Sequence, residues 1–242
     1  MSTSPPPRRV LTRRPVVAWA FYDWANSAFA TTVMAGFFPV FFKEYWNAGV
    51  VATESTFRLG LLNGLGAAVI ALLAPVLGAI ADRSSSRVRM LMMVTLLGCA
   101  ATAGLALVAQ GHWLAAALLY MLASLGFWGG IVFNDSLLLH VAEPGEYDLV
   151  SGYGYSLGYL GGGLLFAVNV FMTLKPQLFG LADAGEAVRA SFVTVGVWWL
   201  VFALPCVLIV KERSSVPSVG AAAAVREGFR ELRGTLVEIR RY

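Results

Sequence analysis

Charged side chains are scarce in this sequence of 242 residues, because Lys, Arg, Asp and Glu together make up only 13% of it. Soluble globular domains carry about 25% charged residues. Hydrophobic residues reach 58%, and the mean hydropathy is +0.70. This composition excludes a water-soluble globular enzyme and indicates a protein that lies within a membrane.

Cysteine is also scarce, since the chain has only Cys99 and Cys206. Each lies inside an apolar run rather than in a loop where it could pair, so the sequence predicts neither a disulfide framework nor a thiolate metal cluster. The net charge is +4, but the arginines flank apolar segments, where they set membrane topology. We therefore expect no nucleic-acid partner, and no motif indicates a cofactor or a metal site.

Six apolar segments are long enough to cross the hydrocarbon core of a bilayer, which takes about 20 helical residues. None has the alternating pattern of a barrel strand, and lipid cannot satisfy an open strand edge. The sequence therefore predicts an all-α fold, a polytopic membrane bundle of six transmembrane helices. The expected spans are residues 16–42, 57–81, 88–109, 113–141, 149–174 and 190–210.

The basic residues divide unequally between the two sides of this bundle. If the N-terminus is cytoplasmic, 14 of the 18 Lys and Arg residues lie on the cytoplasmic side, as the positive-inside rule requires. We therefore expect both termini in the cytoplasm, with 1–15 as an arm, 16–210 as the transmembrane domain and 211–242 as a linker. The linker has apolar residues three or four positions apart, which is typical of an amphipathic helix on the membrane or on the ends of the bundle.

An ionisable side chain inside a membrane helix costs about 2.5–3.5 kcal/mol on insertion scales and needs a reason to be there. Asp23 lies about two turns into the first span, and Asn26, Ser27 and Thr31 follow it on the same helix face. This polar stripe is expected to face the bundle interior. For Asp23 we favour a functional role, whereas hydrogen bonding between helices explains Asn26 and Ser27 equally well.

A second acid, Asp135, follows Asn134 near the cytoplasmic end of the fourth span. The first and fourth spans thus each carry an acid and an amide, whereas the third and sixth carry no charge in their apolar cores. This distribution suggests two three-helix repeats, and in transporters built that way the first helix of each repeat lines the substrate pathway. The predicted pathway residues are Asp23, Asn26, Ser27, Thr31, Asn134 and Asp135.

The turn between the second and third spans, GAIADRSSSRVRM, crowds several charges into a short cytoplasmic segment. An acid at a helix end can hold the arginines of such a turn in a latch that a moving partner breaks. A plain positive-inside turn explains the arginines but not Asp82. Asp135 lies near the same cytoplasmic level, so the sequence leaves open whether it belongs to the latch or to the pathway. The predicted cytoplasmic gate consists of Gly78, Asp82, Arg83 and Arg87, with Asp82 within salt-bridge reach of Arg83, Arg87 or Arg89.

The fifth span opens with SGYGYSLGYLGGG, which places Gly154, Gly158 and Gly162 at four-residue intervals. Glycines so spaced let two helices approach closely in lipid. The second span offers Gly60, Gly64 and Ala68 at the same interval. We expect these two faces to serve helix packing or sliding, and in a half-transporter to form an interface that a partner fills. The run is not a phosphate-binding loop, because it follows no strand and lacks a Lys-Ser/Thr ending.

These segments also resemble a known family. GAIADRSSSR is similar to the loop signature of the major facilitator superfamily, Gly-x-x-x-Asp-Arg-x-Gly-Arg-Arg/Lys, although Ser85 and Ser86 replace a glycine and a basic residue. AWAFYDWANSAF, FFPVFF, VFNDSLL and GYSLGYLGGG resemble the branch of autophagy-linked vacuolar amino-acid effluxers and their bacterial permease relatives. The resemblance covers most of the chain, and AWAFYDWANSAF is its most specific part. The matching loop residues are Gly78, Asp82, Arg83 and Arg87.

The resemblance implies a permease that works by alternating access in the bacterial plasma (inner) membrane, with amino acids as the solutes that fungal members export. Such transporters have twelve helices, whereas this chain has six predicted spans and stops at RELRGTLVEIRRY, which looks like the linker before a seventh helix. We therefore expect an N-terminal half, whose partners are a small-molecule substrate, lipid and a second six-helix half or a second copy. An inactive truncated fragment is the alternative.

Two other function classes compete with a transporter. An intramembrane protease needs a Gly-x-Ser nucleophile and a buried histidine, and neither His112 nor His140 is offered such a serine, so we expect no enzyme. A non-transporting membrane scaffold or sensor would bind a partner through the tail helix. The acids inside the spans argue against this class, because a scaffold gives them no role.

Overall fold

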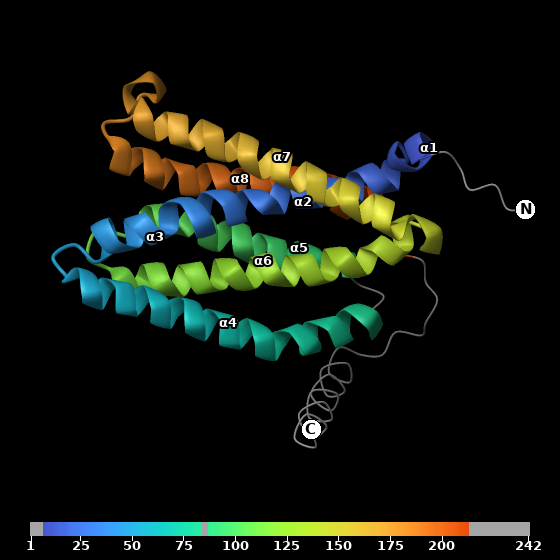
Figure 1. Cartoon of the computed structure of the whole chain (residues 1–242), viewed down its shortest axis with the longest axis horizontal. Helices are drawn as coiled ribbons and strands as arrows, with labels where there is room; N and C mark the ends of the chain where they lie inside the picture. The colour runs from blue at the N-terminus through green and yellow to red at the C-terminus, as the bar shows by residue number, and fades with distance from the viewer. Residues whose placement is uncertain (1–6, 84–86, 213–242) are drawn as a thin grey trace, which may run out of the picture.

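The computed structural model describes residues 7–83 and 87–212, apart from the side chains of 7, 8, 79, 80, 82 and 83. This part of the chain is almost entirely helical and contains no strand. Six helices are long and apolar enough to cross a membrane, and they run side by side (Figure 1). The predicted all-α bundle of six transmembrane helices is confirmed. The tail segment predicted to be amphipathic, from Val225 onward, lies outside the described residues.

The first span is continuous over Arg14–Trp46 but changes its helix type along the way. A short helix, α1 (Pro7–Leu11), precedes it. Its parts are α2 (Arg14–Ala28), the π-helix η1 (Phe29–Phe37), α3 (Phe38–Phe41) and a second π-helix, η2 (Phe42–Trp46). Hydropathy did not predict the π-helical parts, because an apolar segment has the same hydropathy whether it forms an α-helix or a π-helix. Single π-turns inside helices frequently occur at functional sites.

The other five spans are regular α-helices, joined in places by short 3-10 turns. The spans are α4 (Ala52–Arg83), α5 (Arg87–Gly104), α6 (Trp113–Val141), α7 (Tyr147–Leu174) and α8 (Ala184–Ile209). The turns are η3 (Leu105–Leu107), η4 (Pro144–Glu146) and η5 (Pro176–Phe179). α8 begins before its expected start at 190, because Asp183 Oδ1 accepts the backbone N–H of Glu186 at 2.8 Å and caps a polar first turn.

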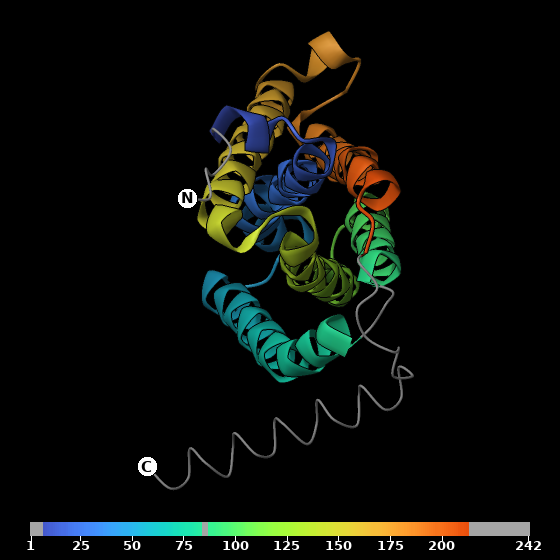
Figure 2. The same cartoon turned by 90° about the vertical axis from the view of Figure 1, so that its right-hand side faces the viewer.

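α2 lies in the middle of the bundle, where it packs against α7 and α8 (Figure 2). α5 packs against α6 and α8, whereas α4 lies at the edge and contacts chiefly α6. Trp19, Tyr22 and Phe29 of the first span are fully buried, and the ring of Phe29 lies 5.7 Å from that of Trp199 in α8. Because neighbours hold the first span on several sides, its polar face has a fixed direction.

α4 presents an apolar face that no described residue covers. Leu61, Leu65 and Leu72 are 51%, 52% and 58% exposed. Methyl groups placed on Gly60 or Gly64 would meet nothing within 4 Å. In a membrane bundle such a face meets lipid or another protein surface.

Candidate functional site

A pocket of about 290 Å³ lies between the first span, α6 and α7. Its wall combines aromatic rings with polar groups from all three helices. Every predicted pathway residue except Asn134 lines this pocket, so the polar stripe of the first span and the acid of α6 meet in one place. The lining residues are Trp19, Asp23, Asn26, Ser27, Ala30, Thr31, Phe127, Ile131, Asp135, Ser151, Tyr155, Gly158 and Tyr159.

Asn134 is fully buried behind the pocket wall and connects α6 to α2. Its side-chain amide donates to Asp23 Oδ1 at 3.3 Å, and its backbone carbonyl accepts a hydrogen bond from Trp19 Nε1 at 2.7 Å. These two contacts hold Asp23 and Trp19 in place on the pocket side of α2. Asn134 is therefore a positioning residue, a role that the sequence pattern did not separate from lining the pathway.

Both acids of the pocket lack an opposite charge. The ion pairs among the described residues involve neither Asp23 nor Asp135, and no Lys, Arg or His is among the lining residues. Asn26 lines the same pocket and is only 3% exposed, yet its Oδ1 has no hydrogen-bond donor among the described residues. The pocket thus gathers negative charge with no positive counterpart among its lining residues.

The passage from α2 into the π-helix η1 falls within the polar stripe. Thr31 Oγ1 lies 3.1 Å from the carbonyl oxygen of Ser27, one turn earlier, and 3.0 Å from the carbonyl oxygen of Gly162 in α7. The hydroxyl therefore joins η1 to α7 in addition to lining the pocket. Thr31 therefore both connects two packed helices and lines the pocket, which are two roles that polar residues have on membrane helices.

The glycines of α7 let its backbone lie directly against α2. A methyl group on Gly158 would lie 2.6 Å from Ser27 Oγ, and one on Gly162 would lie 2.9 Å from the Ser27 carbonyl oxygen. Gly154 faces Trp19 and the carboxylate of Asp23 in the same way. The expectation that this glycine face waits for a partner is wrong, because α2 already fills it. Glycine spacing predicts close approach but does not say which helix approaches.

The predicted gate is described only in part. The side chains of Asp82 and Arg83 lie outside the described part of the structure, so the salt bridge of Asp82 stays a prediction. Gly78 lies on α4, and a methyl group there would meet nothing within 4 Å. Arg87 Nη1 lies 3.7 Å from Glu212 Oε2 and 3.4 Å from His140 Nε2.

Glu212, which follows α8, also caps the start of α5. Its Oε1 accepts the backbone N–H of Val88 at 3.0 Å, so a residue three positions after the end of the last span is tied to the first turn of the third span. Sequence reasoning missed this contact. The sequence offered as a signal only an acid between two basic residues, in KER after the apolar run, and such an acid is ordinary at a membrane boundary.

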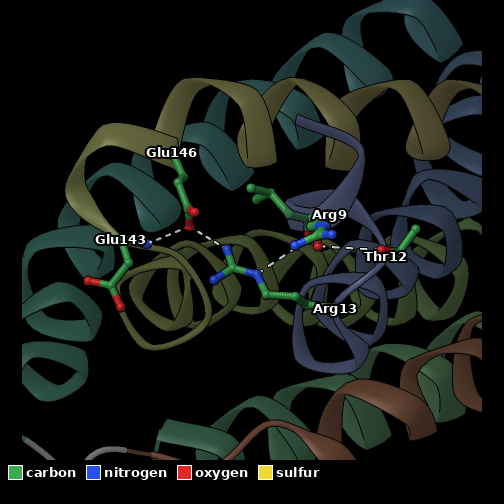
Figure 3. A network of polar contacts seen from close by, with 6 residues as sticks. Arg9, Thr12, Arg13, Glu143 and Glu146 are labelled. Atoms are coloured by element: carbon green, nitrogen blue, oxygen red, sulfur yellow. Dashed lines mark hydrogen bonds and ion pairs between the residues drawn. The ribbon is translucent and has the colours of Figure 1, made fainter. Parts of the chain in front are cut away.

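A second ion pair, between Arg13 and Glu146, joins the start of α2 to the turn between α6 and α7 (Figure 3). Glu146 Oε2 also accepts the backbone N–H of Glu143 at 3.0 Å, and the Thr12 hydroxyl lies 3.4 Å from the carbonyl oxygen of Arg9. The sequence did not predict this pair, because its members lie 133 positions apart. It fixes the entry of the first span at the end of the bundle where α7 begins.

A second hollow, of about 340 Å³, lies between η1, α4 and α6. Its polar lining residues are Asn63, Tyr120 and Ser124, and no acidic or basic residue lines it. We therefore assign the candidate site to the first pocket, where the charges converge.

Comparison with known proteins gives the family. The sequence model of the family described as "Vacuole effluxer Atg22 like" matches residues 45–146 and 140–242. The chain is 33% identical over 227 residues to a protein of Bacillus subtilis (strain 168) described as an uncharacterized MFS-type transporter, YxiO, covering 93% of this chain and 53% of that one. A protein of Aquifex aeolicus (strain VF5), described as uncharacterized, is 24% identical over 213 residues, covering 88% of this chain and 49% of that one.

Autophagy-related protein 22 of Yarrowia lipolytica is 29% identical over 68 residues, which are 28% of this chain and 11% of that protein. No solved structure matches the chain. The chain spans about half the length of the two bacterial relatives. Since the family model covers most of the chain, which also forms a six-helix membrane bundle, the protein belongs to the Atg22-like family, a branch of the major facilitator superfamily.

Proposed function

We propose that this chain is one six-helix half of a permease that moves a small solute across a membrane by alternating access. The pocket between the first span, α6 and α7 supplies its part of the solute path. One observation carries the proposal: two carboxylates, Asp23 and Asp135, line one pocket in an otherwise apolar bundle. Acids inside a membrane protein are costly and mark solute or ion pathways. Transporters built from structural repeats bind their solutes where the repeats meet.

The other wall of the path comes from outside the described chain. The two bacterial relatives are about twice as long as this chain, and α4 has an uncovered apolar face. On α7, Tyr155 and Tyr159 line the pocket yet are 64% and 78% exposed. A second six-helix half, or a second copy of this chain, would cover these faces and close the pocket. Asp135 is exposed as well and lines the same pocket.

The resemblance to the effluxers makes amino acids the first solutes to test and the bacterial inner membrane the location to test. The excess of basic residues favours both termini on the cytoplasmic side. In that arrangement 1–15 and 211–242 flank the transmembrane domain 16–210, and the gate with Arg87 lies at the cytoplasmic ends of the helices. A cysteine introduced after Lys211 should then react with a membrane-impermeant reagent only from the inside.

The test of the proposal is solute flux in proteoliposomes. The chain is reconstituted as a demonstrated monomer, as a dimer and together with a second six-helix half, and uptake of pooled radiolabelled amino acids and other small solutes is measured against an unlabelled internal pool. We expect flux only with a second half or in the dimer. Asp23→Asn should reduce it, whereas Asp183→Asn, at the exposed N-cap of α8, should not.

Two outcomes would contradict the proposal in different ways. Flux from a monomer of this chain would show that one bundle suffices, which refutes the half-transporter assignment. No flux in any arrangement, with the protein folded, would favour the scaffold or sensor class, in which the pocket has no solute.

A further inference from the structure

The pocket between the first span, α6 and α7 has a chemical preference that the family does not specify. Its lining residues include the carboxylates of Asp23 and Asp135, while no lining residue is basic. Neither acid has an ion-pair partner among the described residues. Only one described donor, the amide of Asn134, bonds to either carboxylate, and it occupies Asp23 Oδ1.

Asn26 gives a second and independent indication of a ligand site. The side chain is 3% exposed and lines the pocket, and its Oδ1 has no donor among the described residues. A buried acceptor without a donor costs about 1–3 kcal/mol of folding free energy. A ligand that donates a hydrogen bond to this acceptor removes that cost. The ligand that satisfies Asn26 is therefore a hydrogen-bond donor.

The aromatic side chains of the pocket add to this preference. Trp19, Phe127, Tyr155 and Tyr159 line it together with the acids, and the faces of such rings attract cations. A volume of about 290 Å³ leaves room for an organic body beside the charged group. An inorganic ion alone would leave that apolar space unfilled.

We propose that this pocket binds the ammonium group of an organic cation, with Asp23 and Asp135 as counter-charges, Asn26 as an acceptor and the aromatic rings around the organic body. The inference rests on the proposed function, because it names the solute class of the same pocket. The proposal also predicts how an amino acid lies in the pocket. The ammonium end lies against this bundle, and the carboxylate finds no cation among the lining residues, so an amine without a carboxylate binds this chain better than the amino acid does.

The test is equilibrium binding to the full chain purified in lipid nanodiscs, with probes that share one isobutyl side chain. Radiolabelled isoamylamine is the reporter. Unlabelled leucinamide is the cationic competitor, leucine the zwitterion, 4-methylpentanamide the neutral isostere and 4-methylpentanoate the anion. We expect leucinamide to compete best, leucine less well and the neutral amide at least on the order of tenfold more weakly, with no competition by the anion.

Asp23→Asn and Asp135→Asn should each weaken isoamylamine binding by on the order of tenfold or more. Both variants keep the shape of the side chain, and Asn at position 23 can still accept the hydrogen bond of Asn134. Asp183→Asn makes the same chemical change at an exposed residue outside the pocket and should bind like the wild type. Asp135 makes no hydrogen bond within the described residues, so its variant tests the charge even if Asp23→Asn unfolds.

A sodium arm separates an organic from an inorganic cation. Replacing KCl by NaCl should leave isoamylamine binding unchanged. If Na⁺ displaces the amine and its own binding depends on Asp23, the pocket is an inorganic cation site and the proposal is overturned. It is also overturned if isoamylamine does not bind, if the neutral amide competes equally, or if both variants bind like the wild type. If neutral or anionic solutes are transported in that case, the proposed transport function stands although the cation proposal fails. If the amine binds but no solute is transported, the cation proposal stands although the transport function fails.

Discussion

The contact between α2 and α7 can be tested by adding a single methyl group. In Gly162→Ala the new Cβ would lie 2.9 Å from the carbonyl oxygen of Ser27 and 3.0 Å from Thr31 Oγ1. Ordinary contacts at such positions measure 3.4–4 Å. The near atom is backbone, so no rotamer change relieves the clash, and one of the two helices must move by about half an ångström.

The cost follows from three contributions. Forced overpacking costs about 1–3 kcal/mol, and weakening the hydrogen bond between Thr31 and the carbonyl of Gly162 adds about 1 kcal/mol. Replacing Gly by Ala inside a helix returns about 1 kcal/mol. The net loss is about 1–3 kcal/mol, and a chain of this size loses about 2–4 °C of its unfolding midpoint per kcal/mol.

Gly163→Ala is the matched control, because a methyl group on Gly163 would meet nothing within 4 Å. It keeps the gain in helix propensity, so its stability should equal or exceed that of the wild type. The measurement is the thermal unfolding midpoint of both variants in the same detergent, followed by intrinsic fluorescence. If the two alanine variants unfold at the same temperature, the close approach of α2 and α7 described above is refuted.

Three further substitutions test other contacts. Trp19→Phe removes the 2.7 Å hydrogen bond to the carbonyl of Asn134. It should lower the free energy of unfolding by about 1–2 kcal/mol and with it the unfolding midpoint, and an unchanged midpoint would show that the bond contributes nothing. Asp183→Ala removes the cap of α8 and should cost about 0.5–2 kcal/mol, while Asp183→Asn should retain the stability, and equal losses would argue against capping. Glu212→Ala should speed hydrogen exchange at the backbone amide of Val88 more than Glu212→Gln does, because Gln still offers an acceptor; equal rates would contradict the cap on α5.

Hydropathy predicted the six spans because burial in lipid depends on local composition, which the sequence displays directly. Helix periodicity placed Asp23, Asn26, Ser27 and Thr31 in one polar stripe, since residues three, four and eight positions apart share a helix face, and all four line one pocket. The roles within the site were harder to predict. Nothing in the order Asn134–Asp135 says that the amide donates to Asp23 while the acid lines the pocket and is exposed.

Contacts between distant segments account for the rest of what the sequence did not predict. Gly158 signals that a backbone comes close, but its spacing did not identify α2 as the helix that approaches. The pairing of Arg87 with Glu212 links the ends of two spans whose proximity depends on the whole packing arrangement. The π-helical stretch Phe29–Phe37 is set by hydrogen-bond register, which apolar composition does not encode.

The glycine contact between α2 and α7 has a mechanical consequence. Gly158 and Gly162 bring the two backbones together with no side chain from their own positions on α7 between them, whereas side chains on both helices usually absorb small shifts between helices by changes of rotamer. We therefore expect the two helices to translate and tilt together. The pocket walls that they form would then keep their relative geometry in a rearrangement, and the pocket would change its width through α6 and the surface that covers its open side.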